Sequence, residues 1–183
     1  MNLRTMIVLV AAVAAGCGPP ETLGPDASGP PVTDTAQDGR FRLAIGLTSG
    51  IQHAGVEIQV RTQLTYLGPV ASVVVGSDWS PPVYFQLEHL DGDRDMTEVL
   101  SLLMCERTPL NSGVAIDIPF VKSGGFGEDD PDAEYWRTFL NDPQLRLPAG
   151  HWRVSAHFQG TIDDECRGPA QRLSAEVTFL VVP

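Results

Sequence analysis

The sequence predicts an all-β protein, an antiparallel sandwich of about seven strands with one short helix. Three observations support this fold class. Apolar and polar residues alternate with a period of two in most segments after residue 40. Clusters of Gly, Pro, Ser, Asn and Asp separate these segments, as turns would. Strand-like and helix-like segments do not alternate along the chain, which argues against a parallel sheet.

The alternation is clearest between residues 56 and 66, where apolar side chains fall on one face and polar side chains on the other. A helix would scatter the same residues around its circumference, so the pattern indicates a half-buried strand. The other expected strands show the same alternation or a short apolar run, and they span residues 41–47, 70–75, 83–87, 114–120, 152–158 and 173–181. We expect the last two to form a hairpin that closes one edge of the sandwich.

Two further segments interrupt the strand pattern. Asp130 and Pro131 precede AEYWRTFL, which predicts a short helix over 131–140 that crosses between the sheets. Residues 96–105, MTEVLSLLMC, fit either a strand or two helical turns. We interpret them as a strand because the neighbouring topology requires one.

Residues 1–16 have the pattern of an export signal. Arg4 gives a positive start, residues 6–15 are apolar, and small residues follow. Ten helical residues rise only about 15 Å, too short for a hydrocarbon core of roughly 30 Å. The stretch Ala14-Ala15-Gly16-Cys17 resembles the lipobox of bacterial lipoproteins, although that family more often has Leu where this chain has Ala14.

The lipobox resemblance implies that Cys17 carries a diacylglyceryl group on its sulfur and becomes the mature amino terminus. Such an anchor would hold the protein on a membrane of the bacterial cell envelope. Gly18 replaces the Asp that retains some Gram-negative lipoproteins in the inner membrane, so the outer membrane is favoured. The alternative is an ordinary secretory signal cut nearby, with Cys17 unmodified.

Residues 17–39 follow as the lipidated cysteine and a Pro- and Gly-rich linker, predicted to be a disordered tether because they offer little to bury. The alternative is an irregular arm packed on the domain. Residues 40–183 then form one β-sandwich domain. The formal net charge is −11, and losing Arg4 with the leader makes it −12. This charge repels phosphate, so nucleic acid is not an expected partner.

Residues 145–152, LRLPAGHW, resemble the turn that leads into the penultimate strand of immunoglobulin-like and fibronectin-type domains. Trp152 stands where those families often carry an aromatic residue. The resemblance implies an immunoglobulin-like sandwich. It does not imply a function, because such domains host many unrelated ones.

Two cysteines remain after Cys17, and an exported compartment permits Cys105 and Cys166 to form a disulfide. The bridge would close a loop of about 61 residues and stabilise the fold by roughly 4 kcal/mol. The alternative is two separate thiols, one of them buried.

Catalytic and metal-binding patterns are weak, so we predict no enzyme activity, no metal site and no cofactor. The turn at 91–95 starts like a calcium loop, but Met96 and Leu102 occupy the positions that require Gly and an acid. The acidic run at 128–134 has no diagnostic spacing for calcium. His151 and His157 share a strand face but lie roughly 20 Å apart, too far to bind one zinc ion.

Aromatic residues in predicted loops and on the helix are the best ligand-binding candidates, because a rigid ring buries a large area at small entropic cost. These candidates are Trp79, Phe126, Tyr135 and Trp136. The alternative is that they plug the open end of the sandwich.

These observations lead to one main functional hypothesis. The protein is expected to be a membrane-anchored, non-catalytic envelope lipoprotein whose immunoglobulin-like domain is a protein-binding or structural module. The alternative is a carbohydrate-binding module, possibly stabilised by calcium. A hydrolase would require a cluster of Asp, His and Ser formed only in the fold. No oligomeric state is predicted.

Overall fold

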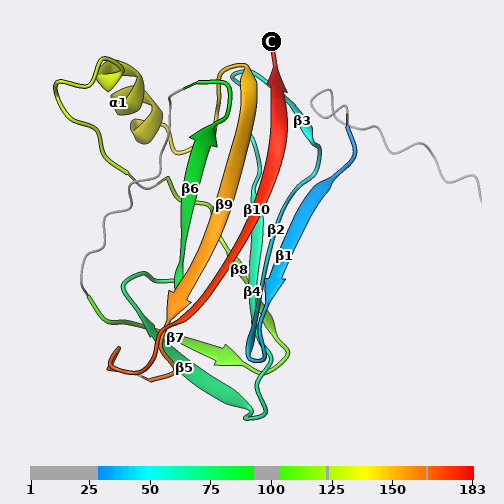
Figure 1. Ribbon diagram of the computed structural model, residues 1–183, viewed down its shortest axis with the longest axis vertical. Coiled ribbons are helices and arrows are strands. Elements are labelled where there is room, and N and C mark those ends of the chain that lie inside the picture. Colours follow the sequence, from blue (N-terminus) through cyan, green and yellow to red (C-terminus); the bar gives the residue numbers. More distant parts are fainter. Residues whose placement is uncertain (1–28, 93–103, 123, 164) are drawn as a thin grey trace, which may run out of the picture.

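The computed structural model describes residues 29–92, 104–122, 124–163 and 165–183 (Figure 1). Strands make up 49% of the structure and helix 6%. The described residues form ten strands and one helix, which confirms the all-β fold class with one short helix. No helix among the described residues combines the length and the hydropathy that crossing a membrane requires.

The strands form two four-stranded sheets and a two-stranded ribbon. The first sheet has the order β1-β2-β4-β8, the second has the order β3-β10-β9-β6, and the ribbon pairs β5 with β7. Their bounds are β1 (Val32–Gln37), β2 (Phe41–Leu47), β3 (Ile51–His53), β4 (Arg61–Tyr66), β5 (Ser72–Ser77), β6 (Val83–His89), β7 (Glu106–Asn111), β8 (Ala115–Ile118), β9 (Gly150–Gly160) and β10 (Gln171–Val182).

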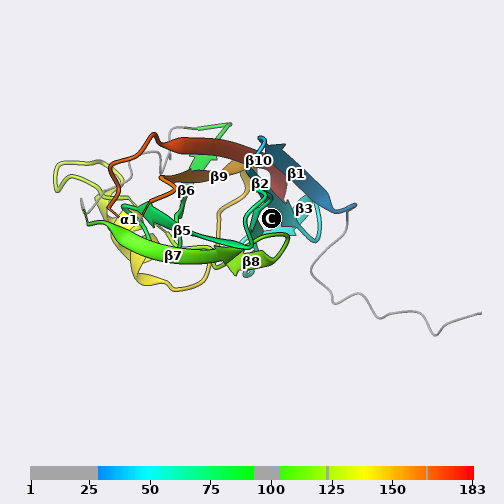
Figure 2. The same cartoon turned by 90° about the horizontal axis from the view of Figure 1, so that it is seen from below.

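The sheets are arranged as a β-sandwich. Figure 2 shows β9 and β10 in one layer, with β5, β7 and β8 on the opposite side. The chain passes from the first sheet to the second where β2 ends, at the bend around Ser49 and Gly50 that leads into β3. Neighbouring strands are antiparallel except β3 and β10, which pair in parallel.

The core lies between the sheets and is built from the inward residues of the alternating strands. The predicted inward faces of β2, β6, β9 and β10 are confirmed. Phe41 contacts Tyr66 within the first sheet and Phe158 across the core, with ring centroids 5.5 and 4.7 Å apart. Trp152, the aromatic residue that contributes to the resemblance to immunoglobulin-like domains, is fully buried. Alternation therefore identified the residues that hold the two layers together.

The strand predicted over residues 56–66 is wrong in its first half, because β4 begins only at Arg61. The last β2–β4 pair joins Gly46 to Arg61, and β2 then turns away toward the second sheet. The residues before Arg61 therefore have no strand beside them. Ile58 is still buried, and its N–H donates to Leu145 O at 2.8 Å. Val114, predicted to face inward before β8, is half exposed instead.

The prediction of a disordered tether over 17–39 is wrong for its last part. β1 pairs with β2 along its whole length, from Val32 opposite Leu47 to Gln37 opposite Arg42. Asp38 then closes the turn into β2, because its Oδ1 accepts the N–H groups of Arg40 and Phe41. The ordered domain therefore begins before residue 40.

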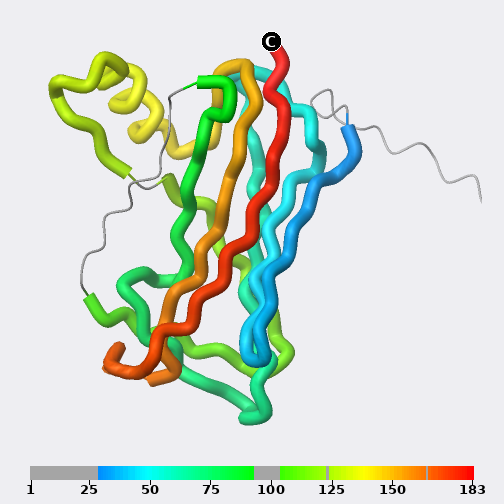
Figure 3. The backbone as a smooth tube through the Cα atoms, viewed as in Figure 1, coloured from blue at the N-terminus to red at the C-terminus, as the bar shows by residue number. Residues whose placement is uncertain are grey.

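The hairpin of β9 and β10 was predicted to close an edge, but it occupies the centre of the second sheet. β6 lies beyond β9, and the three-residue β3 lies beyond β10, as the backbone trace in Figure 3 also shows. Strand β7 was not predicted. Most of the strand predicted over 96–105 lies outside the described residues, and Met104 and Cys105 precede β7 without joining a strand.

The predicted helix over 131–140 is confirmed as α1 (Ala133–Asn141). It was expected to cross between the sheets, but it lies to the side of β6 (Figure 1). Trp136 and Phe139 bury its inner face. Lys122 holds its carboxyl end, because its Nζ donates to Phe139 O at 2.7 Å and to Asp142 O at 2.8 Å. These bonds satisfy carbonyls that a helix end leaves unpaired.

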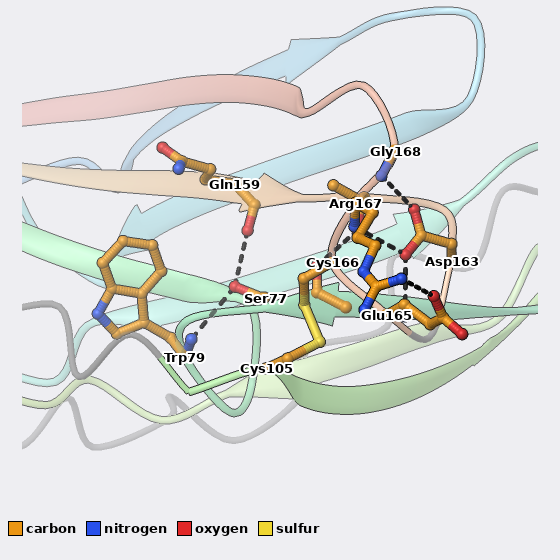
Figure 4. Close-up of a disulfide and its surroundings, with 11 residues drawn as sticks. Ser77, Trp79, Cys105, Gln159, Asp163, Glu165, Cys166, Arg167 and Gly168 are labelled. Atoms are coloured by element: carbon orange, nitrogen blue, oxygen red, sulfur yellow. Dashed lines mark hydrogen bonds and ion pairs between the residues drawn. A yellow bond between two sulfur atoms is a disulfide. The ribbon is translucent and has the colours of Figure 1, made fainter.

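The predicted disulfide is confirmed between Cys105, directly before β7, and Cys166, in the β9–β10 connection (Figure 4). Asp163 shapes that connection by accepting the backbone N–H groups of residues 165, 167 and 168. These bonds outweigh desolvation and lower the pKa of Asp163. Gly76 of β5 lies so close that a Cβ there would be 2.6 Å from Asp163 O. The disulfide thus joins the ribbon to the second sheet.

Candidate binding surfaces

The outer face of the second sheet carries mostly polar side chains. On β9, His151, Arg153, Ser155 and His157 alternate with the buried residues of the core, as the sequence pattern predicted for the two histidines. Strand register places neighbours beside them on β6 and β10. Across the sheet the outer rows are Tyr84–His157–Ser174, Gln86–Ser155–Glu176 and Glu88–Arg153–Thr178.

A small pocket of about 170 Å³ lies over the middle of this face. Ser155 is only 8% exposed and forms its floor. Arg153 is held beside it, with Nη1 3.0 Å from Glu88 Oε2 and Nε 3.7 Å from Glu176 Oε1. We call this site the Ser155 pocket, and its lining is entirely polar: Gln86, Glu88, Arg153, Ser155, His157 and Glu176.

His157 forms one wall of the Ser155 pocket. Its ring stacks on Tyr84 with centroids 4.9 Å apart, and its Nδ1 lies 3.0 Å from Ser174 Oγ. Burial of the ring lowers the pKa of His157, and the nearby charge of Glu176 opposes this only in part. The imidazole is therefore neutral at neutral pH. Its Nε2 is buried and has no hydrogen-bond partner among the described residues.

Trp79, predicted from sequence as a ligand-binding residue, extends this aromatic row. Its ring lies 4.6 Å from that of Tyr84. The backbone N–H of Trp79 donates to Ser77 Oγ at 3.2 Å, and Ser77 Oγ donates to Gln159 O at 2.8 Å (Figure 4). Trp79 is partly buried, and the chain thus sets it at the end of the row Trp79, Tyr84 and His157.

The other three predicted aromatics lie at α1 and contact one another or neighbouring side chains. Trp136 is 7% exposed and belongs to the core, which favours the alternative that it plugs the sandwich over a role in ligand binding. Its ring is needed to cover the apolar space beneath the helix. Tyr135 stacks on Phe139 at 5.9 Å, and Phe126 lies 5.6 Å from the Arg137 guanidinium. No ring contact among the described residues joins this group to Trp79.

The outer face of the first sheet carries a second surface, a shallow open groove of about 1090 Å³. Its floor is formed by the small residues Ala44 and Gly46 on β2. Thr33 and Thr35 on β1 rise on one side, and β4 rises on the other. Sequence reasoning missed this groove, because polar and small residues on an outward face usually indicate only a solvated surface.

The first sheet also places charges along the groove, on the β4 side. Arg61 lines it, and Gln63 Nε2 donates to Asp117 Oδ1 of β8 at 2.9 Å. Hydrogen-bond donors and acceptors therefore both face the groove. The hydrogen bond between Gln63 and Asp117 fixes the positions of these two side chains.

Two histidine pairs have the chemistry of partial catalytic dyads. Asp91 Oδ2 lies 2.7 Å from His151 Nδ1 and also accepts the His151 backbone N–H, which lowers the pKa of Asp91. The other pair is His157 with Ser174. The two histidines are separated by six residues on β9, roughly 20 Å along a strand. The fold therefore does not join Asp, His and Ser into one triad among these residues.

Metal ligands are also dispersed. Within the described parts of the chain, no group of three or more His, Cys, Asp or Glu side chains could hold a metal ion. The two acidic segments considered for calcium, residues 91–95 and 128–134, lie after β6 and before α1, and residues 93–95 are outside the described residues.

No protein-family model, curated protein or solved structure matches this chain. Its function is therefore inferred from its own surfaces, the groove of the first sheet and the Ser155 pocket of the second.

Proposed function

We propose that the protein is a non-catalytic binding module of the bacterial cell envelope that takes an extended segment of an envelope protein into the groove of its first sheet. The observation that carries this proposal is the shape of that groove. Small residues hollow it along β2, while longer polar side chains rise from β1 and β4.

The geometry suits an extended peptide. Side chains on one face of a strand repeat about every 6.6 Å, and an extended peptide laid along the groove has the same repeat. Thr33 and Thr35 can donate or accept hydrogen bonds, Arg61 only donates, and Gln63 does both. A peptide backbone or polar side chains could therefore be matched at successive positions. The open shape admits a chain that continues beyond both ends.

The anchor is part of the same proposal. Lipid on Cys17 would hold the module on the envelope, with the outer membrane favoured, and only residues 18–31 separate that cysteine from β1. The tether is thus shorter than the sequence pattern indicated, which would keep the first sheet near the lipid surface. A partner already in the envelope would be met at high effective concentration.

An immunoglobulin-like topology remains the finer proposal for the fold. It is supported by the two packed sheets, by the chain that changes sheet between β2 and β3, and by the buried Trp152 on the penultimate strand.

The binding proposal is tested by affinity capture from detergent-solubilised envelopes. Ala44→Arg would fill the groove floor, and Thr178→Arg, at an exposed position on the second sheet, is the matched control. We expect the natural protein and the control to retain the same partner and Ala44→Arg to lose it. Capture of no partner, or equal capture by Ala44→Arg, would contradict the groove as the binding surface.

The anchor is tested separately by mass spectrometry of the mature amino terminus. We expect an acylated Cys17 in membrane fractions and release of a Cys17→Ser variant into the soluble fraction. An unmodified thiol at Cys17 in the native protein would refute lipidation.

A further inference from the structure

We propose that the Ser155 pocket binds a neutral, polyhydroxylated ligand, a single sugar residue. This inference goes beyond the proposed function, since the pocket lies on the second sheet and the peptide groove on the first. Three observations lead to it: the balance of charge, the unsatisfied polar atoms, and the size of the pocket with its aromatic border.

The charges in the pocket disfavour anionic ligands. Arg153 is flanked by Glu88 and Glu176, and this group of three side chains carries one net negative charge. Phosphate, sulfate or a carboxylate would therefore be repelled. A hydroxyl group is compatible with both kinds of charge, because it donates to a carboxylate and accepts from a guanidinium or imidazole N–H.

Two buried polar atoms at the pocket have no hydrogen-bond partner among the described residues. They are His157 Nε2 and Arg153 Nε, and the latter is 3.7 Å from Glu176, beyond hydrogen-bond distance. Buried polar atoms are nearly always hydrogen-bonded, so each indicates a missing partner such as water or a ligand. Both belong to residues that line the Ser155 pocket. Both atoms are covered in this structure, so the Arg153 and His157 side chains would have to rotate toward the ligand; adjacent hydroxyl groups of one sugar ring would then satisfy both.

The size and the border of the pocket suit one sugar ring. A volume of about 170 Å³ holds several water molecules but not an oligosaccharide. Trp79 and Tyr84 continue the surface from His157, and aromatic side chains are favourable neighbours for the apolar C–H groups of a sugar. A longer glycan would place one unit in the pocket and the next beside this row.

The test uses the mature protein in a detergent without a sugar headgroup. The probes are glucose, galactose, mannose and N-acetylglucosamine. Each is titrated to a concentration on the order of 100 mM, because the affinity for a single sugar is expected to be weak. Backbone amide shifts are followed by NMR. Ser155→Leu fills the pocket floor, Glu176→Gln removes one acceptor charge at an exposed position, and Thr35→Leu on the first sheet is the matched control. Thermal melting checks that each variant is folded.

We expect at least one sugar to give saturable shifts confined to residues 84–88, 153–157 and 174–176. Ser155→Leu should abolish these shifts, Glu176→Gln should weaken binding about tenfold, and Thr35→Leu should leave it unchanged. If Ser155→Leu does not fold, Glu176→Gln decides. No response to any of the four sugars would mean that the pocket holds only water, and the proposal fails. Equal binding by Glu176→Gln, or a saturable response to sulfate at the same amides, would also overturn it.

Discussion

Loss of the disulfide should cost the domain a large share of its stability. Replacing Cys105 and Cys166 by Ala removes a cross-link between residues 61 apart in sequence. The chain-entropy model gives roughly 4 kcal/mol for a loop of this length. A domain of this size loses about 2–4 °C of melting temperature per kcal/mol, so we expect a decrease of about 8–16 °C.

The structure also indicates where the loss should appear first. The ribbon of β5 and β7 is a two-stranded sheet, and such a sheet is marginal on its own. Besides the disulfide, the hydrogen bonds that join β5 to the second sheet in the described part of the chain lie at its last two residues. Gly76 and Thr161 form a bridge with N–H···O distances of 3.0 and 2.8 Å, and Ser77 Oγ donates to Gln159 O at 2.8 Å. Amides of the ribbon should therefore exchange with solvent earlier than those of β9 and β10.

The assays are thermal melting by circular dichroism and amide hydrogen exchange on the double variant. Met104→Ala, beside Cys105 and 55% exposed, is the matched control and should melt with the natural protein. A decrease of less than about 3 °C would refute the loop-entropy reasoning. Earlier exchange in β9 and β10 than in the ribbon would refute the proposed location of the loss.

Three further predictions follow from single positions. Gly76→Ala should lower the melting temperature, because its Cβ would meet the backbone of Asp163, whereas Gly39→Ala, with nothing within 4 Å, should not. Leu64→Ala at a fully buried position should reduce the free energy of unfolding by about 2–5 kcal/mol in urea titrations. Since burial lowers the pKa of His157, the unfolded state binds more protons as pH falls below 6.5, so stability should decrease there, and His157→Gln should reduce that pH dependence.

The strands that were predicted correctly are those with one buried and one solvated face. β9 and β10 alternate cleanly because each separates the core from solvent along its length. β1 and β7 do not. β1 carries Thr, Asp and Gln on its exposed or half-buried positions, and β7 contains Pro109, which usually argues against a strand. Pro109 is tolerated because β7 is one side of a two-stranded ribbon.

The candidate sites could be predicted only in part, for a related reason. Trp79 was recognised as an aromatic residue in a loop. Its neighbours Tyr84 and His157 were not linked to it, because their contact depends on the register between β6 and β9. The groove of the first sheet likewise requires Ala44 on β2 to lie between Thr35 and Gln63. Register is set by long-range packing, and a period of two does not specify which strands become neighbours.

Both candidate surfaces lie on paired strands, and this has a consequence for binding. β2 is paired on both sides, between β1 and β4, and β9 is paired on both sides, between β6 and β10. Side chains on such strands are held by the ladder and by the core beneath them, so a ligand would not have to order a loop on binding. The inner residues of β9 fix the register that aligns Arg153 with Glu88 and Ser155 with Glu176. The core and the Ser155 pocket thus both depend on the register of β9. A core substitution that shifts β9 would disrupt the pocket without changing any residue that lines it.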